Sequence, residues 1–225
     1  VPVETIVRVA REFATTKPAV AGGERGASMQ TNGVYNRMAI HALNALVGSL
    51  EVSGGVLTQG GHPTTSDPAV VRDDIATEGL KKPRIDWAGT KRYPMAGKVY
   101  QNIGEFATGE GPYKANAIFS YYTNPLFSTP DVKRMFKAFK EVPFIVDFTP
   151  FMSESAEYAD IILPDHTYLE RWQDDGIYPT AGYAVVGLRQ PVVKPLYDTM
   201  HSGEVIFKIA QAMGGSMARS FPWND

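Results

Sequence analysis

The chain has 225 residues, of which 44% are hydrophobic and 20% are charged, a composition that is typical of globular proteins and leaves ample material for a core. Its net charge of −2 gives no electrostatic attraction to nucleic acid or to an anionic membrane surface, so we expect no nucleic-acid partner. The sequence has no cysteine and no run of about 18 apolar residues, which excludes disulfides, thiolate metal sites and a membrane-spanning helix in this chain.

The amino-terminal segment predicts a helix, then a short strand and a glycine-rich turn. Residues 3–16 ("VETIVRVAREFATT") bring Ile6, Val9 and Phe13 to one face with the 3.6-residue period of a helix. Residues 17–33 ("KPAVAGGERGASMQTNG") begin as an apolar run and continue as the glycine-rich turn. Glycines at the end of a strand let the backbone approach a ligand closely, although a plain tight turn explains this turn equally well.

A second helix is predicted directly after the glycine-rich turn. Residues 34–50 ("VYNRMAIHALNALVGSL") carry apolar side chains at helical spacing, and we expect Val34, Met38 and Leu46 to face inward. A strand, a glycine-rich turn and a helix in this order form the first half of a nucleotide-binding-type βαβ unit. The turn matches neither GxGxxG nor a P-loop, so by itself it is weak support for a nucleotide site.

The regular pattern is lost between residues 53 and 115. Stretches such as "SGGVLTQGGHPTTSDP" are rich in glycine, proline, serine and threonine, and the intervening "KKPRIDWAGTKRYPMAGKVY" shows neither a helical nor a strand period. An irregular stretch of this length is uncommon inside a compact domain and usually has a function. We therefore predict an insertion that contacts a ligand or a partner, with a poorly ordered excursion as the alternative.

Regular structure returns after residue 116 with three predicted strands, "NAIFSYYTNP", "PFIVDFTP" and a buried "DIILP". Between the first two, "TPDVKRMFKAFKEV" predicts a helix with Thr129 as its N-cap, Pro130 at its first position and Asp131 in its first turn. Strands at this spacing favour a parallel sheet with right-handed crossovers. The predicted fold class is therefore α/β, a mostly parallel sheet flanked by helices in a nucleotide-binding-like three-layer domain with a long irregular insertion.

The carboxy-terminal segment "HSGEVIFKIAQAMGGS" predicts an amphipathic helix that ends at Gly214 and Gly215. The chain starts at Val1 without a methionine and stops at "FPWND", so we expect a segment of a longer protein. We expect four parts: residues 1–52 as the first part of the α/β domain, 53–115 as the irregular insertion, 116–175 as the remainder of the domain, and 176–225 as a connecting segment and a helix that leads to a further domain.

Polar side chains follow two of the predicted strands where each strand ends. Asn124 follows the first, where its amide would either bind the edge of a heterocycle or fix the Asn-Pro turn. Thr149, Glu154 and Ser155 follow the second. Because the carboxyl ends of parallel strands form the usual ligand-binding edge of an α/β sheet, these turns together predict a binding rim.

The histidines and the remaining acids give weaker signals. No two histidines have metal-ligand spacing, so we expect no histidine metal site. His41 lies in an apolar helix face, which favours a core or interface role, whereas His166, directly after "LPD", is the best placed for function. Asp165 and Glu170 are candidate acid–base groups, but we favour a role in capping the sheet edge.

Four collinear segments of the chain resemble the catalytic subunits of the molybdopterin oxidoreductase family. Residues 31–56 ("TNGVYNRMAIHALNALVGSLEVSGGV") resemble that family's helix and double-glycine loop, and residues 121–131 ("YYTNPLFSTPD") resemble its asparagine–proline turn. Residues 151–172 ("FMSESAEYADIILPDHTYLERW") are similar to its most recognisable segment, and residues 188–215 to the stretch that follows.

The resemblance implies a large multidomain subunit whose bis-molybdopterin guanine dinucleotide cofactor, with molybdenum or tungsten, lies between two α/β domains. The iron–sulfur cluster and the side chain that ligates the metal would lie elsewhere in the parent protein. The implied partners are the rest of its own large subunit, an iron–sulfur electron-transfer subunit and a membrane subunit that interacts with quinone. By position, the cofactor contacts would be Gly22, Gly23, Arg25, Gly26, Asn32, Asn124, Thr149, Glu154 and Ser155.

The sequence departs from the family pattern at Thr149, where many members have an aspartate. A small hydroxyl residue before "PFM", followed by "LPDHTYLERWQDD", is similar to membrane-associated respiratory complexes: polysulfide and thiosulfate reductases, and the molybdopterin-like subunits of menaquinone reductase and alternative complex III. Some subunits of the last two kinds keep the fold without the cofactor. The resemblance further implies a periplasmic location.

Two functions therefore stay open at the level of the sequence. The first is a molybdopterin-dependent oxidoreductase that acts on a small inorganic or sulfur substrate or in a quinone-linked chain. The second is a cofactor-free scaffold subunit of such a membrane complex. A stand-alone α/β domain for an ordinary nucleotide is a poorer third interpretation, because the phosphate-binding fingerprints are missing.

Overall fold

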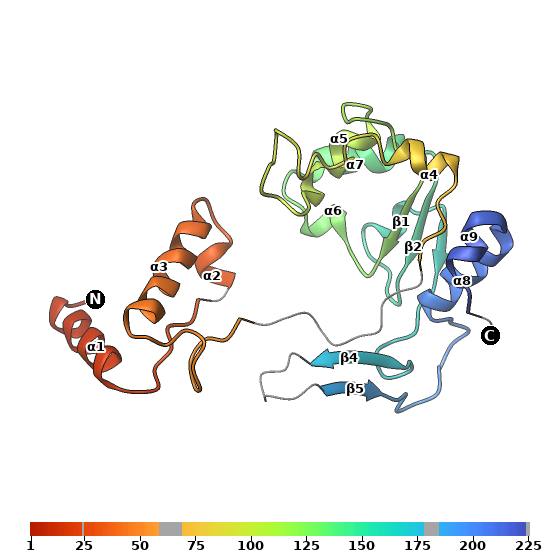
Figure 1. The fold of residues 1–225 in the computed structure, drawn as a ribbon. Coiled ribbons are helices and arrows are strands. Elements are labelled where there is room, and N and C mark those ends of the chain that lie inside the picture. The colour runs from red at the N-terminus through yellow and green to blue at the C-terminus, as the bar shows by residue number, and fades with distance from the viewer. Residues whose placement is uncertain (24, 59–68, 178–184, 224–225) are drawn as a thin grey trace. The chain divides into compact units, whose positions relative to one another are not determined.

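The computed structural model describes residues 1–23, 25–58, 69–177 and 185–223 (Figure 1). The chain divides into two compact units, which are described separately. Unit 1 comprises Val1–Thr64 with Asp175–Gly187, and unit 2 comprises Thr65–Asp174 with Leu188–Asp225. The four-part domain division expected from the sequence stays a prediction.

Unit 1 contains the predicted amino-terminal helices. Helix α1 spans Val3–Thr15, and helix α3 spans Gly33–Leu46, so both predictions are confirmed. A short helix, α2 (Arg25–Ser28), lies inside the predicted glycine-rich turn and packs on α3. Part of the segment predicted as a turn is therefore helical.

The strand predicted before the glycine turn does not form. Residues 17–23 have no regular secondary structure, because the backbone of Ala21 pairs with a side chain instead of a second strand. The Ala21 N–H donates to Asn44 Oδ1 at 2.7 Å, and Asn44 Nδ2 donates to the Ala21 carbonyl at 2.9 Å. Pro18 in the same run has no N–H to donate to a sheet.

The apolar side chains of α3 that the sequence predicts to face inward are exposed instead. Val34, Met38 and Leu46 are 71%, 60% and 82% exposed, and no described segment covers them. The buried positions of this helix are Gly33 and Asn44, while His41 is half-buried. Helical periodicity identifies an apolar face, but it does not identify what covers that face.

Unit 2 is built on three parallel strands, as predicted. They are β1 (Ile118–Tyr121), β2 (Ile145–Phe148) and β3 (Ile161–Leu163), in the order β1-β2-β3. Helices α6 (Pro125–Ser128) and α7 (Val132–Glu141) connect β1 to β2. This α/β arrangement, a parallel sheet flanked by helices, confirms the predicted fold class (Figure 1).

The core of unit 2 lies between α7 and one face of the sheet. The buried residues of α7 recur at helical spacing and meet Ile145 of β2. The cluster consists of Leu126, Met135, Ala138, Phe139, Val142 and Ile145. Burying a large apolar side chain of this kind contributes roughly 1.5–3 kcal/mol, so this cluster is the main apolar support of the sheet.

Two local expectations in unit 2 are wrong. The N-cap of α7 is Asp131, not Thr129, because the Asp131 side chain accepts a hydrogen bond from the backbone N–H of Arg134. Strand β3 is not buried: Ile161 and Ile162 are 44% and 36% exposed. It is an edge strand of the described sheet, so an apolar sequence marked the strand correctly but not its burial.

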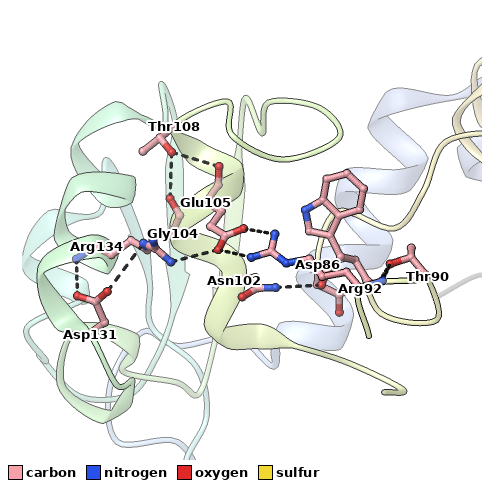
Figure 2. Close-up of polar contacts among 10 residues, drawn as sticks. Asp86, Thr90, Arg92, Asn102, Gly104, Glu105, Thr108, Asp131 and Arg134 are labelled. Carbon is pink, nitrogen blue, oxygen red and sulfur yellow. Dashed lines mark hydrogen bonds and ion pairs between the residues drawn. The ribbon is translucent and has the colours of Figure 1, made fainter. Parts of the chain in front are cut away.

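The segment predicted to be irregular contains short helices and a buried polar network. It holds α4 (Asp74–Gly79), a 3₁₀ turn (Tyr100–Asn102) and α5 (Ile103–Ala107), and α5 packs beside α7 (Figure 1). Figure 2 shows Glu105 of α5 between two arginines. Arg92 donates to both Glu105 oxygens at 2.8 and 3.0 Å, and Arg134 of α7 donates at 3.1 Å.

A second carboxylate of this segment, Asp86, organises the neighbouring loop. It accepts two hydrogen bonds from Arg84, at 3.0 and 2.9 Å, and one from the backbone N–H of Val99 at 2.9 Å. These contacts lower the pKa of Asp86 to about 2, with the Arg84 hydrogen bond as the largest cause. The segment is therefore held by charge pairs rather than by periodic apolar packing.

The remaining elements complete the described chain. They are a 3₁₀ turn (Ala156–Tyr158), a two-stranded sheet of β4 (Gln173–Ile177) and β5 (Val185–Arg189), and helices α8 (Ser202–Met213) and α9 (Gly215–Ser220). Helix α8 ends at Gly214, which has a φ of 67°, as the sequence predicts. None of the helices in the described ranges is long and apolar enough to cross a membrane.

Candidate functional site

The loops that follow β1 and β2 are joined by a cluster of Asn124, Glu154 and Ser155. Asn124 Nδ2 donates to Glu154 Oε2 at 2.6 Å. Its Oδ1 accepts hydrogen bonds from the Ser155 hydroxyl at 2.7 Å and from the Ser155 backbone N–H at 3.2 Å. The structure therefore brings together three of the site residues predicted from the sequence.

The environment of this cluster is buried on one side and open on the other. Ser155 is 1% exposed, and its hydroxyl accepts a further hydrogen bond from the Leu126 N–H at 3.1 Å. Glu154 is exposed, and the hydrogen bond from Asn124 lowers the pKa of its carboxyl group. The cluster thus presents the exposed Glu154 carboxylate beside a half-buried Asn124 and a buried Ser155.

Thr149 lies in the same loop as Glu154 but uses its hydroxyl locally. Thr149 Oγ1 donates to the Phe151 carbonyl at 3.0 Å and accepts from the Phe151 N–H at 3.2 Å. This is a serine/threonine-type turn, in which the side chain shapes the backbone that follows it. No hydrogen bond joins Thr149 to Asn124 among the described residues.

The predicted residues of the glycine turn lie in unit 1, whereas Asn124, Thr149, Glu154 and Ser155 lie in unit 2. Gly22 and Gly23 are in the irregular segment before α2, and Arg25 and Gly26 are in α2 itself. Asn32 precedes α3 and adopts a left-handed conformation with a φ of 65°. An asparagine tolerates this conformation better than most residues, so a local turn explains its presence.

Gly23 lies close against the side chains of α3. A Cβ atom at this position would lie 2.7 Å from Ile40 Cδ1 of α3, which is closer than two carbon atoms approach without a clash. At Gly22 a Cβ atom would have no described atom within 4 Å. The two adjacent glycines therefore have different roles, one packed against the helix and one open.

Arg171, which the sequence analysis did not single out, joins two tyrosines at the end of β1 to Asp165. Arg171 Nη1 donates to Tyr121 Oη and to Asp165 Oδ2, both at 3.2 Å, and its guanidinium lies 5.1 Å from the centroid of the Tyr122 ring. Tyr122 has a φ of 48° and donates its hydroxyl to the His166 carbonyl at 2.8 Å. These contacts fix the backbone two residues before Asn124.

The acids after β3 act as caps, as the sequence favoured. Asp165 is 1% exposed and accepts hydrogen bonds from the N–H groups of His166 and Ser202, the latter at the start of α8. Glu170 accepts from the N–H groups of Thr167 and Leu196, and these bonds lower the pKa of its carboxyl group.

His166 is held by a neighbour, through a contact of 2.8 Å between its Nδ1 atom and Thr199 Oγ1. In the described part of the chain, no three histidine, aspartate or glutamate residues are arranged to hold a metal ion.

Asp147 of β2 is a buried acid without a hydrogen-bond partner in the described part of the chain. It is 1% exposed, and neither of its carboxylate oxygens is bonded to a described residue. Ser120, its register partner on β1, lies on the same face and is also unbonded through its hydroxyl. Burial raises the pKa of Asp147, and the nearby Ser120 hydroxyl offsets only part of this shift.

Comparison with known proteins identifies the chain's relatives. Residues 9–212 match the family described as Molybdopterin oxidoreductase. The molybdopterin-containing subunit of arsenate respiratory reductase from Chrysiogenes arsenatis is 36% identical over 86% of this chain and 24% of its own length. The corresponding subunit of thiosulfate reductase from Salmonella typhimurium is 31% identical over 100% of this chain and 31% of its own length.

A third relative and a solved structure complete the comparison. The molybdopterin-binding-like subunit of menaquinone reductase from Nitratidesulfovibrio vulgaris is 32% identical over 48% of this chain and 16% of its own length. Acetylene hydratase from Pelobacter acetylenicus has the same fold, with a TM-score of 0.73 at 22% identity over all of this chain and 34% of that structure. The chain thus spans between 16% and 34% of the length of each of these proteins. Since the family match extends over most of its residues, the chain belongs to the molybdopterin oxidoreductase family.

Proposed function

We propose that this chain is part of the large subunit of a molybdopterin-dependent respiratory oxidoreductase and binds the guanine dinucleotide of the molybdenum or tungsten cofactor. The whole subunit would transfer electrons or oxygen to or from a small inorganic or sulfur substrate, linked to a quinone chain. Membership of the family supports the molybdopterin chemistry. The arsenate and thiosulfate reductase relatives support a substrate of this class.

The observation that carries the proposal is the Asn124–Glu154–Ser155 cluster at the carboxyl ends of β1 and β2. Ligands of open α/β sheets bind outside this edge. Asn124 donates to the exposed carboxylate of Glu154, which positions this carboxylate and lowers its pKa. A carboxylate accepts hydrogen bonds only, and the N–H groups of a guanine base are suitable donors.

The residues of the chain fit a dinucleotide better than they fit a metal. The open side of Gly22 admits a ligand close to the backbone, and the exposed guanidinium of Arg25 suits a phosphate. The described residues form no metal-ligand cluster, so metal ligation is assigned to another part of the subunit. The bound cofactor supplies the redox chemistry, and this chain binds and orients its dinucleotide end.

The proposal extends to the subunit's surroundings. The partners are the rest of the same large subunit, an electron-transfer subunit with iron–sulfur clusters and a membrane subunit that reacts with quinone. The relatives are themselves named as subunits, which supports an assembly. A membrane-associated position on the periplasmic side is part of the proposal and rests on the likeness to respiratory reductases.

A second candidate function, a cofactor-free scaffold subunit, is favoured by Thr149. The Thr149 hydroxyl donates to the Phe151 carbonyl and accepts from the Phe151 N–H, so the side chain stabilises its own loop. The menaquinone reductase relative, whose name describes it as molybdopterin-binding-like, supports the same alternative. Under this function the rim at Asn124 would hold loops together without a ligand.

The substitution Asn124→Asp in the intact subunit separates the two functions. It removes the donor to Glu154 and places a second carboxylate beside it, so we expect bound guanine nucleotide and metal to fall by about threefold or more. Asn116→Asp, at an exposed position just before β1, is the matched control and should leave both unchanged. Nucleotide released by acid hydrolysis and metal by elemental analysis are the measurements. If Asn124→Asp kept wild-type nucleotide content, metal content and turnover, Asn124 would not be a cofactor contact, and the proposal would lose its main support.

A further inference from the structure

The backbone before α2 is held by the side chains of α3. Asn44, which is completely buried, both donates to and accepts from Ala21, at 2.9 and 2.7 Å. The amide of this one side chain therefore replaces the two hydrogen bonds that a neighbouring strand would make. The pair ties Ala21 to a position near the end of α3.

A second side chain of α3 holds the same segment two residues further on. Arg37 Nη1 donates to the carbonyl oxygen of Gly23. Ile40, one turn along the helix, packs against Gly23, so a side chain at that position would have to displace the Ile40 side chain. Residues 37, 40 and 44 recur at a spacing that puts them on one side of a helix. That side of α3 is thus a three-point clamp on residues 21–23.

The clamp leaves Gly22 facing away from α3. The residues on both sides of Gly22 are bonded to the helix, whereas its own Cβ position has no described neighbour within 4 Å. Gly22 is itself exposed, whereas Ala21 and Gly23 are half-buried. The clamp therefore fixes an open stretch of backbone at the glycine turn in one orientation before any ligand is bound, and fixing a binding loop in advance lowers the cost of binding.

We infer that Asn44 and Arg37 are positioning residues for the glycine turn, holding its backbone in place for the guanine dinucleotide. This inference rests on the proposed function of the turn. Neither residue has to touch the ligand, because both act through the backbone of residues 21–23. Asn44 sets the position of the turn and Arg37 its orientation at Gly23.

The test uses the intact large subunit and two variants of the clamp. Asn44→Ala removes both contacts to Ala21 and risks misfolding, because Asn44 is buried. Arg37→Ala removes one contact from a half-buried side chain and should keep the melting temperature close to that of the wild type. Arg37→Lys restores a donor. Arg8→Ala, at an exposed arginine of α1 that pairs with Glu12, is the matched control.

Two readouts are needed, one for the ligand and one for the turn. The first is guanine nucleotide retained after gel filtration, which we expect to fall by about threefold to tenfold in Arg37→Ala and to recover partly in Arg37→Lys. The second is hydrogen exchange of the peptide that contains Ala21, which should become faster in both clamp variants and stay unchanged in Arg8→Ala.

The outcomes separate this inference from the proposed function. Wild-type nucleotide retention and wild-type exchange in folded Arg37→Ala would overturn the positioning role. A wild-type subunit that carries no guanine nucleotide would instead overturn the proposed function, and the exchange of the Ala21 peptide would then decide alone whether the clamp exists.

Discussion

Asp147 is a buried acid of the central strand whose pKa is raised. Its carboxyl group is buried in the central strand without a partner among the described residues, and burial raises its pKa above the ordinary value of 3.8. A raised pKa means that folding favours the protonated form. The stabilising contribution of this group is therefore complete below pH 3.8 and is lost as the pH rises through the raised value.

Asp147→Asn should accordingly stabilise the protein at neutral pH. The amide has the shape of the protonated acid and carries no charge, so we expect the free energy of unfolding at pH 7 to rise by about 1 kcal/mol. The gain should shrink as the pH falls towards 3.8, where the wild-type acid is itself protonated. Urea unfolding at several pH values measures it, with exposed Asp198→Asn as the control. A variant less stable than the wild type at pH 7 would show that the carboxylate has a favourable partner.

The sequence predicted some residues of the candidate site and of the clamp on residues 21–23, but not others. Asn124 and Ser155 were found because they follow strands in polar turns, and the structure joins them. Asn44 and Arg37 were missed because a polar residue in an apolar helix gives no signal of its partner. The partner of Asn44 is a backbone group 23 residues away, which only the folded chain brings close.

At the level of elements, the charge network on Glu105 connects the long insertion to α7. Glu105 is 6% exposed and is shared by Arg92, in the loop before α5, and Arg134, in α7 (Figure 2). Helix α7 in turn packs on the central strand through the apolar cluster. The Glu105 carboxylate therefore links the insertion, through α7, to the sheet that carries the candidate site.

Glu105→Gln should loosen this connection. An amide cannot receive both guanidinium groups as a carboxylate does, and the two arginines are partly exposed, so we expect a loss of about 1–3 kcal/mol in the free energy of unfolding. Glu78→Gln, at an exposed pair with Lys81 on α4, is the matched control and should change stability by less than about 0.5 kcal/mol. Chemical denaturation gives both values. Equal effects of the two substitutions would mean that the buried network contributes no more than a surface pair.

Some of the helices and strands could be predicted from the sequence and others could not. Periodicity predicted α1, α3, α7, α8 and all three parallel strands, because the spacing of apolar residues is a local property. It failed for the strand before the glycine turn, since a strand needs a partner and Asn44 took that place. It also failed inside the insertion, where charge pairs rather than apolar repeats support the backbone.

At the scale of the whole molecule, the chain matches 24% and 31% of the length of two of its relatives. The fold class and the family followed from the sequence, because the spacing of the three parallel strands and the collinear motifs are local features of the chain, and the family match covers residues 9–212. Burial did not follow, since the exposed sides of α3 and β3 depend on what lies against them.

The central claim is that this chain holds a molybdopterin guanine dinucleotide, and analysis of the intact large subunit tests it most directly. The measurement is molybdenum and tungsten by elemental analysis, together with guanine nucleotide released by acid hydrolysis, on the same purified sample. The account predicts near-stoichiometric metal accompanied by guanine nucleotide. A subunit that contains neither would contradict it and would show that the fold serves as a scaffold.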